Sequence, residues 1–251
     1  MSQGHVLITG GARGLGRQVA LYMAQRGYRV TVNYRESRRE ALELVAAIRS
    51  LGGEAAAIAG DVGRPGEAEG LVRQAEKELG PIHVLVHGAG PFERQKIPVA
   101  EASLDLWRAM LEGNLSSAFY LCRVLLPGMR SRRFGRLIFF GFAEVEGAPG
   151  WPGRGPYAAA KAGLLSLVRT LALEEAPYGI TANMVAPGDI RQPWKEKTIA
   201  EAEGVAVPEP MGRPGTGEDV ARVVAFLAER ASGYITGSVV AVTGGLLPLR
   251  D

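Results

Sequence analysis

The chain has 251 residues, of which 47% are hydrophobic, and carries a formal net charge of +3. These values suit one large globular domain and argue against nucleic-acid binding, because the charge is small and the densest basic run, residues 129–133, is typical of a solvated helix end. The single cysteine, Cys122, excludes an internal disulfide and a thiolate metal cluster, and the three histidines lack metal-ligand spacing.

The N-terminal part enters an apolar segment, residues 5–9, without a preceding signal sequence. No apolar run reaches the length of about 18 residues that a membrane-spanning helix needs. We therefore expect a cytoplasmic protein with no membrane segment.

Short apolar runs alternate with longer segments of helical periodicity along the chain. Strands are predicted at residues 5–9, 28–34, 54–61, 82–88, 136–141, 180–188 and 238–244, and helices at 16–26, 37–51 and 65–79 among others. The strands are almost uninterrupted apolar runs, which is typical of parallel strands covered on both faces. We predict a single α/β domain over residues 1–251, a Rossmann-type doubly wound sheet of about seven parallel strands.

Residues 191–215 interrupt this alternation with a long, proline-punctuated segment. Loops of this length inside a compact domain usually serve a function, so we predict a substrate lid. Arg191 and Lys195 at its start are candidates for contact with an anionic substrate or an acidic carrier protein, although exposed lid charges explain them equally well.

A glycine-rich turn follows the first predicted strand and precedes a predicted helix. It contains Gly10, Arg13, Gly14, Leu15 and Gly16. Glycines at these positions permit a tight turn and allow a pyrophosphate to approach the backbone at the N-terminus of the helix. The sequence therefore predicts a dinucleotide site here.

The end of the second predicted strand bears on the choice of cofactor. Enzymes that prefer NAD usually have an acidic residue there, whereas this chain has Asn33, Tyr34 and Arg35. The guanidiniums of Arg13 and Arg35 suit a 2′-phosphate, so NADP(H) is favoured. The acidic side chain of the next residue, Glu36, counts against the assignment of NADP(H) as the cofactor.

Further motifs in the same order resemble those of the short-chain dehydrogenase/reductase family over essentially the whole chain. Beside the glycine turn, the matching segments are Asp61-Val62, His87-Gly88-Ala89-Gly90, Asn114, Tyr157-x-x-x-Lys161, Pro187-Gly188 followed by Ile190, Tyr234 to Gly237 and Gly244-Gly245. In the segment His87-Gly88-Ala89-Gly90, His87 and Gly88 stand where the family usually has two asparagines. Within the family, the nearest likeness is to 3-oxoacyl-[acyl-carrier-protein] reductases.

The resemblance implies an NADP(H)-dependent oxidoreductase that acts on a carbonyl group. It places Asp61 and Val62 at the adenine and Pro187-Gly188 beside the nicotinamide. The implied substrate is a small carbonyl compound, either free or linked as a thioester to an acidic carrier protein. Relatives pair through the helices around Asn114 and Tyr157, so a homotetramer is expected.

Tyr157 and Lys161 are four residues apart, which places both on one face of a helix. A phenol with a pKa of about 10 is a weak acid–base group at neutral pH and benefits from a neighbouring cation. We expect Tyr157 to supply the proton in the reduction, and Lys161 to lower the pKa of Tyr157 and hold the nicotinamide ribose. By the resemblance, Asn114 anchors a water that links Lys161 to solvent.

The catalytic serine of the family, which hydrogen-bonds the substrate oxygen, has no counterpart here. No serine or threonine occurs between Gly135 and Ser166. Two ways of counting place either Phe142 or Glu144 at that position, in a lengthened loop that also contains Trp151. Losing one preorganised donor typically costs about a hundred- to a thousandfold in rate. Substrate-side candidates are therefore Phe142, Glu144, Trp151 and Gln192, the last standing near the family's usual threonine.

Three interpretations remain open at this point. The enzyme works with a substitute donor, namely a loop N–H, Asn114 or a water. Alternatively, Glu144 fills the site, as an acidic residue does in pteridine reductases of this family, and the substrate is a nitrogen heterocycle. Thirdly, the chain is an NADP(H)-binding sensor with weak catalysis, against which the presence of Asn114, Tyr157 and Lys161 argues. We favour NADPH-dependent carbonyl reduction of the 3-oxoacyl-reductase type.

Overall fold

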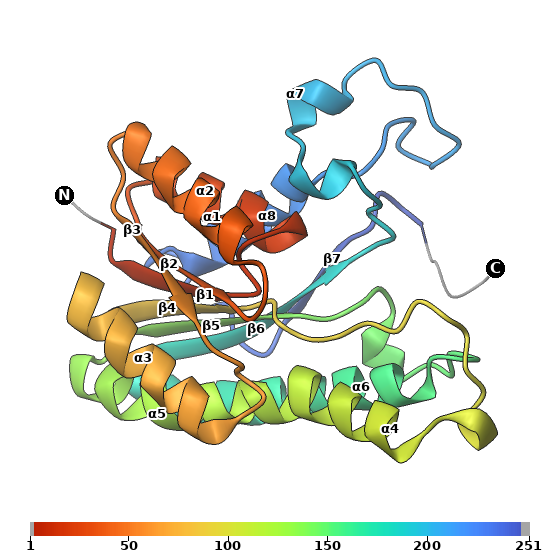
Figure 1. Cartoon of the computed structure of the whole chain (residues 1–251), viewed down its shortest axis with the longest axis horizontal. Helices are drawn as coiled ribbons and strands as arrows, with labels where there is room; N and C mark the ends of the chain where they lie inside the picture. The colour runs from red at the N-terminus through yellow and green to blue at the C-terminus, as the bar shows by residue number, and fades with distance from the viewer. Residues whose placement is uncertain (1–2, 247–251) are drawn as a thin grey trace.

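The computed structural model describes residues 3–246, in which seven parallel strands form one sheet (Figure 1). The strand order is β3-β2-β1-β4-β5-β6-β7. The strands are β1 (His5–Thr9), β2 (Arg29–Tyr34), β3 (Ala55–Ala59), β4 (Ile82–His87), β5 (Gly135–Phe140), β6 (Ile180–Pro187) and β7 (Val239–Val242). The seven predicted strands and the doubly wound fold are confirmed.

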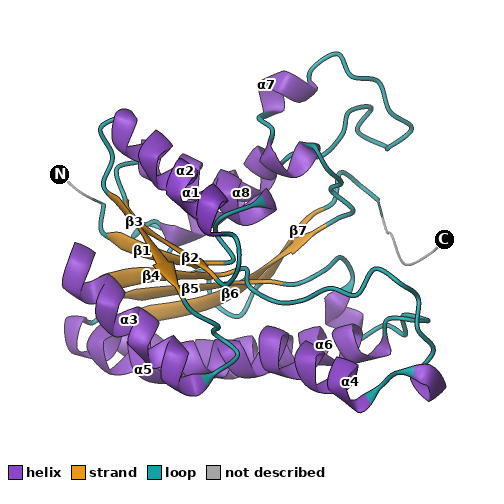
Figure 2. Cartoon of the chain, in the orientation of Figure 1, coloured by secondary structure: helices purple, strands orange, loops and turns teal. Residues whose placement is uncertain are grey.

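Helices cover both faces of the sheet (Figures 1 and 2). On one face lie α1 (Gly14–Gln25), α2 (Arg38–Ser50) and α8 (Gly217–Ala228). On the other lie α3 (Pro65–Leu79), α4 (Leu104–Leu111), α5 (Ser117–Arg132) and α6 (Gly155–Glu175). Short helical turns are η1 (Val99–Glu101), η3 (Val145–Gly147), η4 (Ala176–Tyr178), η5 (Trp194–Glu196) and α7 (Ile199–Ala202), and a π-helix, η2 (Glu112–Ser116), joins α4 to α5.

Two apolar cores lie on the two sides of the sheet, and this explains why the strands are uninterrupted apolar runs. Every residue of β1 and of β5 is buried, because each strand faces a helical layer on both sides. One core joins the sheet to α1, α2 and α8, and the other joins it to α3, α5 and α6. Cys122 is buried in the second core.

The order of the strands positions the functional site. The chain runs outward from β1 to β2 and β3, and then returns to place β4 on the other side of β1. Loops from neighbouring strands therefore diverge between the carboxyl ends of β1 and β4, which leaves a crevice there. A hydrogen bond from Gly88 N to Thr9 O, 3.2 Å long, joins the two strand ends at its base.

The segment 191–215 contains η5 and α7 and extends from the side of the sheet that α1 and α8 cover (Figure 1). Its first part, η5, packs against both α1 and α8. The side chain of Trp194 joins the core on that side. The beginning of the segment is therefore held close to the start of α1.

Candidate active site

The turn between β1 and α1 is built from glycines for steric reasons. Gly10 has a φ of 63°, and a Cβ at this position would lie 3.0 Å from the backbone of Ala89. A Cβ on Gly16 would overlap the carbonyl oxygen of Gly10. Both glycines allow the turn to lie tightly against the end of β4, and this leaves the N-terminus of α1 open toward the crevice.

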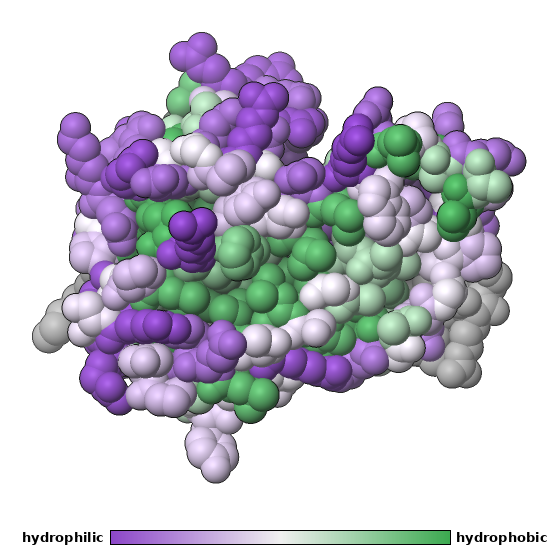
Figure 3. Space-filling view, turned by 90° about the horizontal axis from the view of Figure 1, so that it is seen from below, coloured by the Kyte–Doolittle hydropathy of each residue, from purple (hydrophilic) through white to green (hydrophobic). Residues whose placement is uncertain are grey.

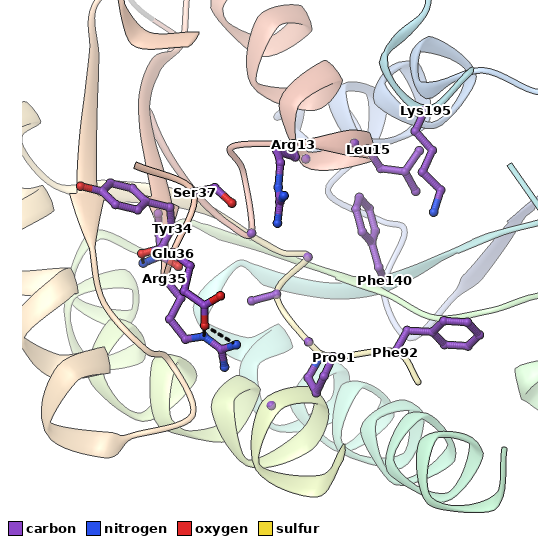
Figure 4. Close-up of a pocket in the computed structure, with 18 of the residues that line it drawn as sticks. Arg13, Leu15, Tyr34, Arg35, Glu36, Ser37, Pro91, Phe92, Phe140 and Lys195 are labelled. Atoms are coloured by element: carbon purple, nitrogen blue, oxygen red, sulfur yellow. Dashed lines mark hydrogen bonds and ion pairs between the residues drawn. The ribbon is translucent and has the colours of Figure 1, made fainter. Parts of the chain in front are cut away.

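A cleft of about 1000 Å³ opens at the carboxyl ends of β1 and β4 (Figure 4). Thirteen of the predicted cofactor residues line it: Gly10, Arg13, Gly14, Leu15, Gly16, Tyr34, Arg35, Asp61, Val62, Gly88, Ala89, Gly90 and Ile190. Tyr34 and Arg35 lie at one end, and Phe92, Phe140 and Lys195 at the other (Figure 4). The volume and shape suit an extended dinucleotide.

The N-terminus of α1 already holds a negative charge, supplied by the predicted lid. Gly14 N donates to the Oε1 of Glu196 over 2.6 Å, and Arg17 Nε lies 3.7 Å from the Oε2. A free backbone N–H at a helix N-terminus favours anions. The carboxylate shows that this end of the cleft accepts an anion, so the residues fit the pyrophosphate of a dinucleotide. Nothing in the local sequence indicated this contact, because the partners are 182 residues apart.

The two arginines predicted to recognise a 2′-phosphate have different surroundings. Arg13 is exposed and points from the glycine turn toward the cleft (Figure 4). Arg35 pairs with Glu36 at 2.9 Å and lies 4.0 Å from Asp61, with 62% of its side chain exposed. The Asn33 amide donates to the Gly60 carbonyl over 3.0 Å. Both guanidiniums border the cleft, and their joint action on a phosphate stays a prediction.

Asn114 lies in the π-helix η2 and is 1% exposed. Its Nδ2 donates to the carbonyl oxygens of Met110 (3.1 Å) and Pro91 (3.0 Å). A Cβ at Gly90 would overlap the Asn114 Oδ1, so glycine is required there. The π-helix, a feature frequent at functional sites, thus brings Asn114 against the loop that follows β4. The predicted role in holding a water stays a prediction.

A buried hydrogen-bond chain explains the departure at His87. On one side of the ring, Ala89 N donates to Thr9 Oγ1 (3.2 Å), and the Thr9 hydroxyl donates to His87 Nδ1 (2.8 Å). On the other side, His87 Nε2 donates to Ser117 Oγ (3.0 Å), and the Ser117 hydroxyl donates to the Gly113 carbonyl oxygen (2.8 Å). This pattern assigns the Nε2–H tautomer. Burial, aided by the charge of a nearby lysine, lowers the pKa of His87 to about 3, so the ring is neutral. The chain connects β1, β4 and the π-helix.

Lys161 and Tyr157 lie near the N-terminus of α6, and Lys161 Nζ is 5.8 Å from the centroid of the Tyr157 ring. Lys161 Nζ donates to the Phe140 carbonyl over 2.8 Å, and Phe140 lines the cleft. Burial lowers the pKa of Lys161 to about 8 and raises the pKa of Tyr157 to about 12. The rise in the pKa of Tyr157 is caused by burial, and the expected lowering of this pKa by Lys161 stays a prediction. Tyr157 therefore keeps its proton at neutral pH.

Of the two candidates for the position of the missing serine, Phe142 has its ring beside Tyr157, and the assignment of that position stays a prediction. The Phe142 side chain is buried, and its ring centroid lies 6.1 Å from that of Tyr157 and 5.1 Å from that of Trp151. Glu144 lies further along the loop at the start of η3, with a left-handed φ of 65°. Phe92, which the sequence did not indicate, contacts Tyr157 edge-on at 4.9 Å. The phenol is thus surrounded by aromatic rings.

The segment after β6 borders the same end of the cleft. Gly188 N donates to Val242 O (2.9 Å), which fixes the Pro187-Gly188 turn against β7. Ile190 is buried and, with Gln192, lines the cleft. Arg191 pairs with Asp189 at 2.6 Å. Gln192 is therefore placed to meet a ligand, whereas the charge of Arg191 is already paired.

Two further properties hold within residues 3–246. None of the helices there combines the length and the apolar character needed to cross a membrane. No group of three or more histidine, cysteine, aspartate or glutamate side chains in that range is arranged to hold a metal ion.

A doubly wound parallel sheet with a glycine turn after β1 defines a class of dinucleotide-binding proteins. The Tyr-x-x-x-Lys pair on the helix after β5 narrows the class further. A family model described as enoyl-(acyl carrier protein) reductase matches residues 10–247. The chain belongs to the short-chain dehydrogenase/reductase family of oxidoreductases.

Similar proteins cover almost the whole chain. YtkK of Bacillus subtilis strain 168, provisionally named an oxidoreductase, is 45% identical over 96% of both chains. The 3-oxoacyl-[acyl-carrier-protein] reductase FabG of Staphylococcus aureus is 35% identical over 96% of both. A Bacillus thuringiensis structure, provisionally named 3-oxoacyl-reductase, has a TM-score of 0.93 at 40% identity, covering 98% of this chain and 99% of that one.

A second solved structure was determined with a cofactor. It is a blue fluorescent protein from a metagenomic library in complex with NADPH, with a TM-score of 0.83 at 32% identity. The match covers 97% of this chain and 98% of that one. At this level of identity the likeness extends beyond the fold to the family.

Proposed function

We propose that the protein is an NADPH-dependent reductase of a carbonyl group, with a reaction of the 3-oxoacyl-[acyl-carrier-protein] reductase type. The observation that carries the proposal is the position of Tyr157 beside Lys161, whose Nζ is held by the carbonyl of the cleft-lining Phe140. The names of FabG and of the NADPH-bound blue fluorescent protein support the same reaction and cofactor.

The cofactor would lie along the cleft, with its pyrophosphate at the Gly14 N–H in the place now taken by Glu196. Arg13 and Arg35 would meet the 2′-phosphate, with Tyr34, Asp61 and Val62 around the adenosine. Gly88, Ala89, Gly90, Pro187, Gly188 and Ile190 would border the nicotinamide end. When bound, the reduced nicotinamide supplies a hydride to the substrate carbon.

The protein's own contribution is to position the substrate and donate a proton. Tyr157 donates its Oη proton to the substrate oxygen, which suits a phenol whose pKa burial has raised to about 12. Lys161, anchored on the Phe140 carbonyl, places a cation behind the ring and is within reach of a ribose at this end of the cleft. Asn114 would connect Lys161 to solvent through a water.

We place the substrate between Gln192, which lines the cleft, and the Phe142 and Trp151 rings that pack beside Tyr157. We favour Phe142, whose ring packs next to Tyr157, as the residue at the family's serine position, and we therefore do not favour the pteridine-type alternative based on Glu144. A thioester substrate carried by an acidic carrier protein would approach past the segment 191–215, which we propose as the lid of a single-domain enzyme. Its half-buried Lys195 lines the cleft and remains available to an anionic group.

We also propose assembly into a homotetramer through α5 and α6. Seen from the side of α4, α5 and α6, the surface shows a broad apolar area (Figure 3). Large apolar side chains exposed on these helices include Trp107, Phe119 and Leu173. Exposed apolar areas of this kind mark interaction surfaces. Size-exclusion chromatography with light scattering tests this, and a monomer at micromolar concentration would refute it.

NADPH consumption tests the proposed function, measured with an acetoacetyl thioester, a quinone, an oxidised pterin, and no substrate. Turnover of a carbonyl compound with NADPH in preference to NADH is expected. Turnover of the pterin alone would favour the heterocycle reductase. Tight NADPH binding with no turnover on any substrate would refute the reductase and favour the sensor.

A further inference from the structure

Three aromatic rings from separate segments surround the phenol of Tyr157. Phe92 follows β4, Phe142 follows β5, and Trp151 precedes α6; we call these three residues the aromatic box. Their ring centroids lie 4.9, 6.1 and 6.0 Å from that of Tyr157, respectively. Phe92 is 47% exposed and lines the cleft, so this ring of the box borders the space that the cofactor and the substrate would share (Figure 4).

The box is held together by contacts between the loops that carry it. The guanidinium of Arg154 donates to the carbonyl oxygens of Arg94 and Gln95, and it lies 5.1 Å from the centroid of Phe92. Ile97 N donates to the Gly153 carbonyl over 3.0 Å. The loop after β4 is thereby attached to the loop before α6, and the rings are positioned before a ligand arrives.

Among Tyr157 and the three residues of the aromatic box, the phenol is the only hydroxyl that can donate to a substrate oxygen. Phe142 fills the space beside Tyr157, and no serine or threonine occurs between Gly135 and Ser166. Within residues 3–246 no hydrogen bond to Tyr157 Oη is formed, so its proton is available. An isolated ketone concentrates negative charge on one oxygen during reduction, and loss of a second donor to that charge typically costs about a hundred- to a thousandfold.

A carbonyl conjugated within a ring makes a weaker demand on the site. A cyclic dione conjugated in this way is a stronger hydride acceptor than an isolated ketone, because its two-electron reduction turns the ring aromatic, so its reduction depends less on a second donor. A flat ring also makes offset or edge-on contacts with the aromatic box, each worth about 0.5–1.5 kcal/mol beyond the area it buries. Phe92 already makes an edge-on contact of this kind with Tyr157, and we expect a substrate ring to lie beside the same two rings.

We propose that the preferred substrate is a planar, conjugated cyclic carbonyl compound of the quinone class, and that Phe142 determines this specificity. The inference rests on the proposed function and narrows its substrate. In the reaction the quinone gains one hydride, which the reduced nicotinamide cofactor supplies, and one proton from Tyr157 Oη. The product is the hydroquinone, the cofactor is oxidised by two electrons, and Tyr157 recovers its proton from solvent.

Anaerobic NADPH oxidation compares 2-methyl-1,4-naphthoquinone with an acetoacetyl thioester in three proteins: wild type, Phe142→Ser and, as matched apolar control, Phe142→Leu. The wild type should show a kcat/KM at least about a hundredfold higher for the quinone. Phe142→Ser should raise kcat/KM for the thioester at least about tenfold over Phe142→Leu, because it restores a donor. Circular dichroism and NADPH binding establish that both variants are folded.

A binding measurement without turnover gives a second readout. The quinone should quench tryptophan fluorescence in the presence of oxidised cofactor, and Trp151→Phe should remove most of that quenching. A wild type that prefers the thioester, or quenching unchanged in Trp151→Phe, would overturn the inference. Failure of both substrates to react while NADPH binds would instead overturn the proposed function, so the two failures are distinguishable.

Discussion

Glu196→Gln should tighten the binding of NADPH. The Glu196 carboxylate accepts the Gly14 N–H at 2.6 Å, and a phosphate oxygen that uses the same N–H must displace it. Charged hydrogen bonds contribute about 1.5–3 kcal/mol and neutral ones about 0.5–1.5 kcal/mol, so neutralising the side chain weakens the competing contact by about 1 kcal/mol. The side chains of Glu196 and Arg17 are 35% and 25% exposed, and solvent screening reduces this effect. A decrease in Kd of about two- to fivefold is therefore expected.

Fluorescence titration of NADPH at low ionic strength measures this change. Glu201→Gln is the matched control, because Glu201 lies in the same segment but pairs with Lys197 outside the cleft and should leave the Kd unchanged. The difference between the variants should shrink at high salt, since the contact is partly exposed. An unchanged or weaker affinity in Glu196→Gln would show that the carboxylate does not compete with the cofactor.

Three further predictions concern charge and packing at the site. Lys161→Met should abolish activity. The same substitution should raise the free energy of unfolding at pH 7 by about 1–2 kcal/mol, because burial penalises the ammonium of Lys161 in the folded state and lowers its pKa to about 8. Chemical denaturation measures this change, and a lower free energy of unfolding in the variant would contradict it. In the wild type, NADPH affinity should weaken as pH rises through about 8, where Lys161 loses its charge, and Lys161→Met should lack that transition. Arg13→Ala and Arg35→Ala should each lower the ratio of NADPH to NADH affinity by about tenfold, and an unchanged ratio in both would refute the predicted 2′-phosphate contacts.

The pH dependence of stability follows from the direction of the two shifts. The folded pKa of Lys161 lies below its unfolded value, so the unfolded chain binds more protons from about pH 8 upward and stability rises with pH in that range. The folded pKa of Tyr157, about 12, lies above its unfolded value of about 10, so this group contributes a decrease in stability above pH 10.

The fold was predictable from the sequence because a local pattern specifies each element. Buried parallel strands need no alternation, and β1 and β5 are accordingly buried throughout and mostly apolar. The glycine turn was also predictable, since the close approach of Gly16 to Gly10 leaves no room for a side chain. These features depend on residues near one another in the chain.

The parts of the site that escaped prediction depend on distant segments. The contact between Glu196 and Gly14 arises where the segment after β6 folds back onto α1. Counting residues could not indicate that Phe142 packs beside Tyr157, because this contact depends on how the loop after β5 folds against the start of α6. The raised pKa of Tyr157 likewise reflects burial under Phe92, which comes from the loop after β4.

The central claim is that Tyr157 supplies the proton for an NADPH-dependent reduction. Single-turnover oxidation of bound NADPH, compared between the wild type and Tyr157→Phe with the best carbonyl substrate, tests it most directly. The account predicts a decrease in rate of at least about a hundredfold with the Kd for NADPH unchanged, since general acid catalysis typically contributes about a hundred- to ten-thousandfold. A Tyr157→Phe variant that oxidises NADPH at nearly the wild-type rate would contradict it.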